Sequence, residues 1–108
     1  MPTFAYRILP PRADFAGTLS EAEGAVMGAH FAFLQSLQAE GKAIFVGRCE
    51  DGAYGIGVFD FPDEATARSV LAKDPAIASG LMRMEFHPFR VVMERGAPRE
   101  VGGATATG

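Results

Sequence analysis

One long helix is the feature of this sequence that most restricts its fold. Ser20 and Glu23 form a capping box, in which each side chain satisfies a backbone N–H group at the start of a helix. Gly41 can adopt the left-handed conformation that stops a helix, so the helix is predicted to run to about Glu40. The chain of 108 residues fits one compact domain with one core, against which this helix is predicted to pack.

The inward face of the predicted helix carries a titratable side chain. At about 100° per residue, His30 falls within an arc of apolar residues formed by Val26, Met27, Phe33, Leu34 and Leu37. His30 is therefore predicted to point at the core or at a cavity, where an imidazole can act as a general acid or base. The alternative is a structural histidine whose ring is satisfied by a backbone carbonyl.

The rest of the chain alternates between strand and helix patterns. Strands are predicted at residues 3–9, 43–46, 54–61 and 81–93, and a second helix is capped by Asp63 and stopped by Pro75. Pro88 favours an edge position for the last strand. The order strand, helix, strand, strand, helix, strand predicts an α+β protein with the ferredoxin-like βαββαβ arrangement, a four-stranded antiparallel sheet with both helices on one face.

The predicted strands carry apolar side chains on both faces, although the helices cover only one. An open sheet of this kind exposes a larger apolar patch than soluble monomers usually tolerate. A homodimer that joins the two open sheet faces, forming a dimeric α/β barrel, is the simplest remedy. Residues 1–93 are assigned to this domain, and residues 94–108, which lack an apolar period, are predicted to be a disordered tail.

Charge and composition exclude several classes of function. The formal net charge of −3 gives no reason to expect nucleic acid as a partner, and no apolar run is long enough to cross a membrane. The single cysteine, Cys49, and the absence of a leader pattern indicate the cytoplasm. The glycines between Gly52 and Gly57 lack a dinucleotide-binding spacing, so no cofactor is predicted.

Several further residues are candidates for a binding site. Gly55 and Gly57 leave part of one strand face without side chains, which often marks the close approach of a ligand or another backbone. Tyr6 and Arg7 can bind an aromatic or anionic ligand, but core packing for Tyr6 and a surface or interface pair for Arg7 are equally consistent with the pattern. No metal site is predicted, since the pair Glu85 and His87 on one strand face offers only two ligands.

Asp74 is a second candidate for acid–base chemistry. It follows the buried pair Val70 and Leu71 by three and four residues, so it lies near the inward face of the second predicted helix. A carboxylate beside His30 would fix the imidazole tautomer and stabilise the imidazolium. The alternative is a local role, because an aspartate before a proline is often a helix terminator that caps nearby N–H groups.

The chain resembles the YCII-related (YciI-like) family of small dimeric α/β-barrel proteins over about residues 3–93. The resemblance depends on the order and spacing of His30-Phe31-Ala32-Phe33-Leu34, Gly41-Lys42, Gly47, Asp51-Gly52, Gly55-Ile56, Asp74-Pro75, Gly80 and Pro88-Phe89-Arg90. Members of this family often carry Gly-Pro where this chain has Gly47-Arg48. Arg48 therefore changes the shape and charge of the pocket wall and is included among the ligand-binding candidates.

The resemblance implies an active site and a class of reaction. A histidine and an aspartate are proposed to form the active site in this family, which here implies His30 and Asp74. The family includes a dehydrochlorinase of a chlorinated hydroxyhydroquinone, and the wider barrel group includes muconolactone isomerase-like enzymes. The expected function is a lyase or isomerase acting on a small hydrophobic or aromatic compound, and the alternative is a dimeric ligand-binding or accessory module without turnover.

Overall fold

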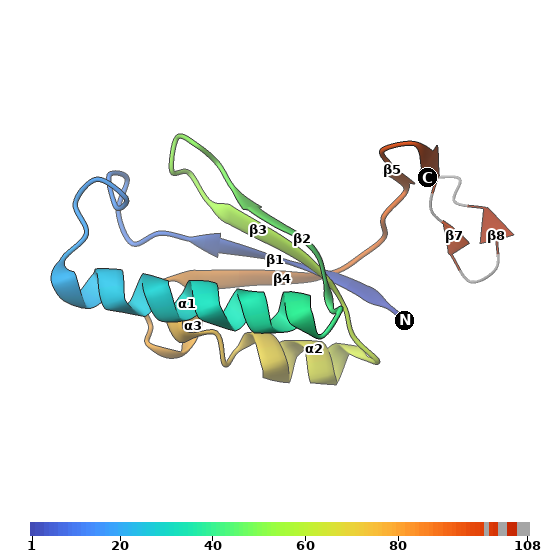
Figure 1. The fold of residues 1–108 in the computed structure, drawn as a ribbon, viewed down its shortest axis with the longest axis horizontal. Coiled ribbons are helices and arrows are strands. Elements are labelled where there is room, and N and C mark those ends of the chain that lie inside the picture. Colours follow the sequence, from blue (N-terminus) through green and yellow to red (C-terminus); the bar gives the residue numbers. More distant parts are fainter. Residues whose placement is uncertain (99, 102–103, 106–108) are drawn as a thin grey trace.

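The sheet is built around strand β1 (Thr3–Leu9), which pairs with a strand on each side (Figure 1). The computed structural model describes residues 1–98, 100–101 and 104–105. Its four-stranded antiparallel sheet has the order β2–β3–β1–β4, with β2 at Ala43–Arg48, β3 at Gly55–Asp60 and β4 at Arg83–Phe89. The predicted ferredoxin-like order of strands is confirmed, and β4 is the edge strand that Pro88 favours.

Helix α1 (Glu21–Ala39) has the boundaries that its sequence indicates. The Ser20 side chain accepts a hydrogen bond from the Glu23 backbone N–H, and the Glu23 carboxylate accepts one from the Ser20 N–H. At the other end, Gly41 has a φ of 75°, a conformation that favours glycine. The helix buries His30, Leu34 and Leu37 against the sheet, so the predicted inward face is confirmed.

The second helical region consists of two helices instead of one. Helix α2 (Glu64–Leu71) is capped by Asp63, as predicted, but it ends before the chain reaches Pro75. Pro75 instead begins the short helix α3 (Pro75–Ala78), and Asp74 is its N-cap. Proline suits the first position of a helix because the N–H group that it lacks would have no partner there. Pro75 is thus a helix start, which corrects its predicted role as a stop.

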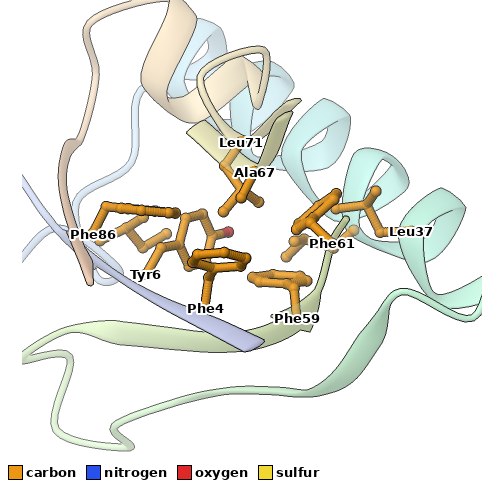
Figure 2. Packing of buried hydrophobic residues seen from close by; sticks show 10 residues of the cluster. Phe4, Tyr6, Leu37, Phe59, Phe61, Ala67, Leu71 and Phe86 are labelled. Carbon is orange, nitrogen blue, oxygen red and sulfur yellow. The ribbon is translucent and has the colours of Figure 1, made fainter. Parts of the chain in front are cut away.

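Aromatic rings fill the layer between the sheet and the helices (Figure 2). Phe4 stacks on Phe86 with ring centroids 5.5 Å apart, and the edge of the Tyr6 ring meets Phe59 at 5.3 Å. Tyr6 lies opposite Gly57 on β3 and opposite Phe86 on β4, so its ring occupies the middle of the sheet. The three helices of the described chain lie on one side of the sheet (Figure 1), and this core lies between the two layers.

Beyond Phe89 the described chain forms two short ladders. Met93–Glu94 (β5) pairs with Ala97–Pro98 (β6), and Glu100–Val101 (β7) pairs with Ala104–Thr105 (β8). Residues 99, 102–103 and 106–108 lie outside the described part of the chain, so the disordered tail at 94–108 stays a prediction. Within the described ranges, no helix has both the length and the apolar character needed to span a membrane.

Candidate active site

His30 and Asp74 meet between α1 and α3. Nδ1 of His30 lies 2.8 Å from Oδ1 and 2.9 Å from Oδ2 of Asp74. Asp74 is fully buried and His30 is 9% exposed, so little water competes for this contact. Both helices pack on the same face of the sheet, and α1 supplies the histidine while the N-cap of α3 supplies the carboxylate.

The buried carboxylate of Asp74 accepts hydrogen bonds from three parts of the chain. Besides the His30 ring, the Tyr6 hydroxyl donates to Oδ2 at 3.0 Å, and the Ala76 backbone N–H donates to Oδ1 at 2.9 Å. A buried carboxylate is costly unless donors surround it. The local capping role considered for Asp74 is therefore present together with its contact to His30, and one side chain serves both.

The contact with Asp74 assigns the two nitrogens of the His30 ring. An ionised carboxylate can only accept, so Nδ1 must carry the hydrogen that it donates. In the neutral ring Nε2 then holds the free lone pair. Nε2 has no hydrogen-bond partner among the described residues. In the same part of the chain no buried side-chain nitrogen or oxygen is without a partner, so Nε2 is not buried. Because His30 lines the cavity, Nε2 is accessible from it.

The hydroxyl of Tyr6 stays protonated. Burial raises the pKa of Tyr6 well above its ordinary value, and the negative charge of Asp74 and the hydrogen bond to it raise it further. Tyr6 is consequently a fixed donor that holds Asp74 in place from the central strand. Its ring also lines the cavity, where it presents an apolar surface.

A cavity of about 520 Å³ opens beside His30. Its wall is mostly apolar and is formed by α1, the loop between β1 and α1, residues of β1, β2 and β3, the turn between β2 and β3, and Met82 before β4. This volume and lining suit a small organic molecule. The residues of the wall are Tyr6, Ile8, Pro10, Phe15, Ala16, Leu19, Met27, His30, Phe31, Leu34, Val46, Gly47, Arg48, Cys49, Gly52, Tyr54, Gly55, Ile56 and Met82.

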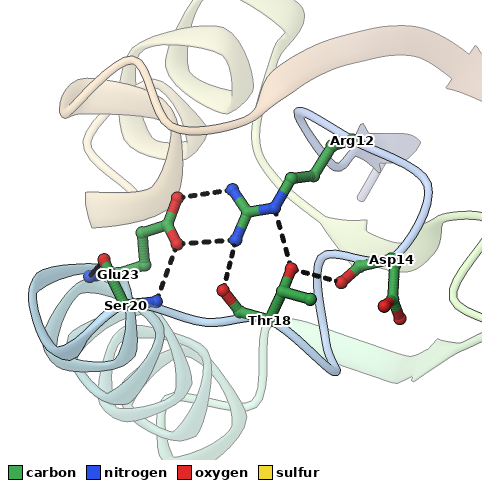
Figure 3. Close-up of polar contacts among 5 residues, drawn as sticks. All are labelled: Arg12, Asp14, Thr18, Ser20 and Glu23. Atoms are coloured by element: carbon green, nitrogen blue, oxygen red, sulfur yellow. Dashed lines mark hydrogen bonds and ion pairs between the residues drawn. The ribbon is translucent and has the colours of Figure 1, made fainter.

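The loop at residues 10–19, which forms part of this wall, is fixed by Arg12 (Figure 3). Its guanidinium donates two hydrogen bonds to the Glu23 carboxylate, at 2.8 and 2.9 Å, and further bonds to the side chain and carbonyl of Thr18. The same guanidinium lies 5.1 Å from the ring of Phe15. The hydrogen bond from Arg12 lowers the pKa of Glu23 to about 2. This contact joins the loop to the first turn of α1.

The other predicted ligand-binding residues are distributed over both sheet faces. Arg48 and Gly55 line the cavity. Arg7 lies on the opposite face, where it forms an ion pair with Glu85 at 2.6 Å. Gly57 is covered by rings, because a Cβ atom there would lie 2.5 Å from Phe59 Cζ and 2.9 Å from Tyr6 Cε1.

Sequence reasoning overlooked much of the cavity wall and the hydrogen bond from Tyr6 to Asp74. The apolar wall residues Phe15, Leu19 and Met82 carry no sequence signal beyond their hydrophobicity. Cys49 is half-buried in the same wall as a free thiol. The Tyr6–Asp74 bond joins residues 68 positions apart and requires the strand register to be known. In the described part of the chain, no three side chains gather as a group suited to a metal ion.

The fold and this site together define a ferredoxin-like α+β protein with a buried histidine–aspartate pair at the wall of an apolar cavity. The sequence pattern of the YCII-related domain matches residues 6–90, and the chain belongs to this family. That match contains both members of the pair.

A solved structure with a similar fold is 5-chloro-2-hydroxyhydroquinone dehydrochlorinase (TftG) from Burkholderia phenoliruptrix AC1100, in complex with 2,5-dihydroxybenzoquinone. The two chains are 18% identical and superpose with a TM-score of 0.61, over 83% of this chain and 94% of the dehydrochlorinase. At this identity the likeness concerns the fold. No curated protein matches the sequence.

Proposed function

We propose that this protein is a lyase- or isomerase-type enzyme that uses His30 as general base and acid on a small hydrophobic or aromatic compound. The observation that carries the proposal is the bond from Nδ1 of His30 to the buried Asp74, at 2.8 Å, which leaves Nε2 accessible from the cavity. Asp74 orients the ring and stabilises the positive charge that His30 gains when it takes a proton.

The proposed chemistry needs only proton transfer. Nε2 removes a proton from a hydroxyl or an acidic carbon of the substrate, and the electron pair moves into the ring system. In an elimination from a chlorinated phenol, the imidazolium first returns the proton to the ring carbon that bears chlorine. Removal of a proton from a second hydroxyl then expels chloride with its bonding pair, and that second proton passes to water. In an isomerisation, the imidazolium returns the proton to another atom of the same substrate. General acid–base catalysis of this kind contributes about 10²–10⁴-fold in rate.

Family membership and the dehydrochlorinase fold favour this class of reaction. The similar structure is named for the loss of HCl from a chlorinated hydroxyhydroquinone, and its ligand is a small quinone ring. A cavity of about 520 Å³ with aromatic walls accommodates a ring of that size. A chlorinated hydroxyhydroquinone is therefore the first substrate to test.

The test compares His30→Gln with wild type in chloride release from 5-chloro-2-hydroxyhydroquinone and in tautomerisation of related enols. His87→Gln is the matched control, since His87 is the other histidine of the chain, is exposed on β4 and does not line the cavity. We expect His30→Gln to lose turnover by at least about 10²-fold while it remains folded by circular dichroism, and His87→Gln to keep it.

Two results would contradict the proposal. One is a folded His30→Gln variant that turns over as fast as wild type. The other is wild-type protein that binds 2,5-dihydroxybenzoquinone but converts neither 5-chloro-2-hydroxyhydroquinone nor the related enols. That result would support a ligand-binding module instead.

We also propose that a second copy of the chain covers the open sheet face. The helices cover the other face (Figure 1), while Phe45 and Phe89 are 52% and 44% exposed. The same face carries the Arg7–Glu85 ion pair, so it presents both charges and is suited to contact its own copy. We propose the cytoplasm as the location of this protein. Sedimentation at micromolar concentration is expected to show a dimer, and a stable monomer would refute the assembly.

A further inference from the structure

Arg48 contributes a cation to the wall of the cavity that His30 also lines. It is the last residue of β2 and lies opposite Gly55 in the β2–β3 ladder. Side chains of paired residues in an antiparallel ladder project from the same face, and Gly55 has none. Gly55 therefore puts no side chain of its own beside Arg48; the Ile8 side chain of β1 lies over Gly55, where a Cβ atom would meet Ile8 Cγ1 at 3.2 Å. Arg48 itself is exposed.

Arg48 has no carboxylate partner among the described residues. None of the residues that line the cavity is aspartate or glutamate. The nearby acidic residues of the β2–β3 turn, Glu50 and Asp51, do not line the cavity, and Asp51 accepts a hydrogen bond from the Ala53 N–H. The ion pairs of the described chain use other cations, namely Arg7, Arg12, His30, Lys42 and Arg68.

The rest of the cavity wall is suited to a flat, apolar ring. Tyr6, Phe15, Phe31 and Tyr54 present aromatic surfaces, and Met27 adds a polarisable side chain. Such walls bind a flat ring by apolar contact and by interaction between rings. A guanidinium presents a planar fork of donors that matches a pair of anionic oxygen atoms.

We propose that Arg48 binds an anionic oxygen group of the substrate, so that the enzyme selects small aromatic acids or ionised phenols over uncharged rings. This inference rests on the proposed function, because it places the charged group of the same ring that His30 deprotonates. The carboxylate or the ionised hydroxyl contacts Arg48, and the apolar part of the ring packs on the aromatic wall.

The inference is tested by equilibrium binding with two pairs of ligands that differ in charge. The first pair is para-hydroxybenzoate and its uncharged isostere para-hydroxybenzamide. The second pair is para-nitrophenol in mildly alkaline buffer, where it is ionised, and uncharged para-nitroanisole. Calorimetric titration gives Kd for wild type, Arg48→Gln, Arg48→Lys and the control Arg83→Gln, whose cation lies on β4 and does not line the cavity.

We expect wild type to bind at least one of the two anions about tenfold more tightly than its uncharged partner. Arg48→Gln should remove that preference without weakening the uncharged ligands, Arg48→Lys should retain part of it, and Arg83→Gln should keep it. The pair that responds tells whether the group is a carboxylate or an ionised hydroxyl. Equal binding of charged and uncharged ligands, an unchanged preference in Arg48→Gln, or no binding of any of them would overturn the inference.

Binding in His30→Gln separates this inference from the proposed function. The variant should keep the preference for anions, because Arg48 and not the proton transfer creates it. If Arg48→Gln loses the preference while His30→Gln turns over normally, only the acid–base proposal fails. If His30→Gln loses turnover and Arg48→Gln binds like wild type, only the anion site fails.

Discussion

Nδ1 of His30 and Oδ1 of Asp74 lie 2.8 Å apart, although 44 positions separate the two residues in the chain. The histidine belongs to the first strand–helix half and the aspartate to the second. Tyr6, on the strand that joins the halves in the sheet, donates to the same carboxylate. Pairing of the two halves is therefore what assembles the candidate site.

Asp74→Asn is expected to lower turnover by about 10²–10⁴-fold. An amide presents an NH₂ group to one of its neighbours, so Nδ1 of His30 can become an acceptor and the ring hydrogen can move to Nε2. The free lone pair is then lost from the cavity side. Nitrogen NMR of the His30 ring distinguishes the tautomers, and wild-type turnover with the hydrogen still on Nδ1 would contradict this role for the carboxylate.

Tyr6→Phe is expected to lower the free energy of unfolding at neutral pH by about 1–2 kcal/mol, because Asp74 loses one donor. The variant should also change stability at high pH. The folded state raises the pKa of Tyr6 above its ordinary 10.0, so the stabilisation is complete below pH 10.0 and is lost as the pH rises above it. Urea unfolding across this range should show a weaker alkaline decline in Tyr6→Phe than in wild type.

Arg12→Gln is expected to raise the pKa of Glu23 from about 2 towards its ordinary 4.5. In wild type the Arg12–Glu23 contact contributes stability above pH 4.5 and loses it as the pH falls towards 2. Carbon NMR of the Glu23 carboxyl group measures the shift directly. Arg83→Gln is the control and should leave the Glu23 titration unchanged, and a titration that is equally unchanged in Arg12→Gln would count against the contact.

Gly57→Ala is expected to destabilise the fold by about 1–3 kcal/mol through overpacking. The added Cβ atom would lie 2.5 Å from Phe59 Cζ and 2.9 Å from Tyr6 Cε1, within the most crowded part of the core. Gly47→Ala is a matched control in β2, where an added Cβ meets no atom within 4 Å. Equal unfolding free energies for the two variants would show that the rings near Gly57 can move aside.

Gly28→Ala is expected to stabilise the protein by about 0.5–1 kcal/mol, because alanine favours a helix interior over glycine. Gly28 is exposed on α1, and an added Cβ there meets no atom within 4 Å. Gly41→Ala should instead destabilise, since its φ of 75° suits glycine. Urea unfolding of both variants checks the contrast, and a loss of stability in Gly28→Ala would indicate that this glycine serves another purpose.

Local patterns predicted the elements well because their signals are short in range. The capping box at Ser20 and Glu23 and the stop at Gly41 each depend on a few neighbouring residues, and all three are present in the structure. The strand order followed from the alternation of elements. Pro75 was misread because one residue can end one helix or begin another, and only the break after Leu71 decides between them.

The candidate site was predicted in part, and the limit was set by long-range register. The inward arc of α1 placed His30, and the position of Asp74 after Val70 and Leu71 placed the carboxylate on the same side. A period of two residues separates the faces of a strand but does not tell which face meets the helices. That is why Arg7 could be considered for the cavity, although it lies on the opposite face.

Both hydrogen-bonded neighbours of β1 follow it late in the sequence, β3 at Gly55–Asp60 and β4 at Arg83–Phe89. During synthesis, the β1 residues Phe4, Tyr6 and Ile8 lack their neighbouring strands until β3 and β4 have left the ribosome. Long-range pairing of this kind slows folding and leaves apolar strands open to aggregation in the meantime. The pairing of β1 on both sides is consequently complete only after β4 has left the ribosome.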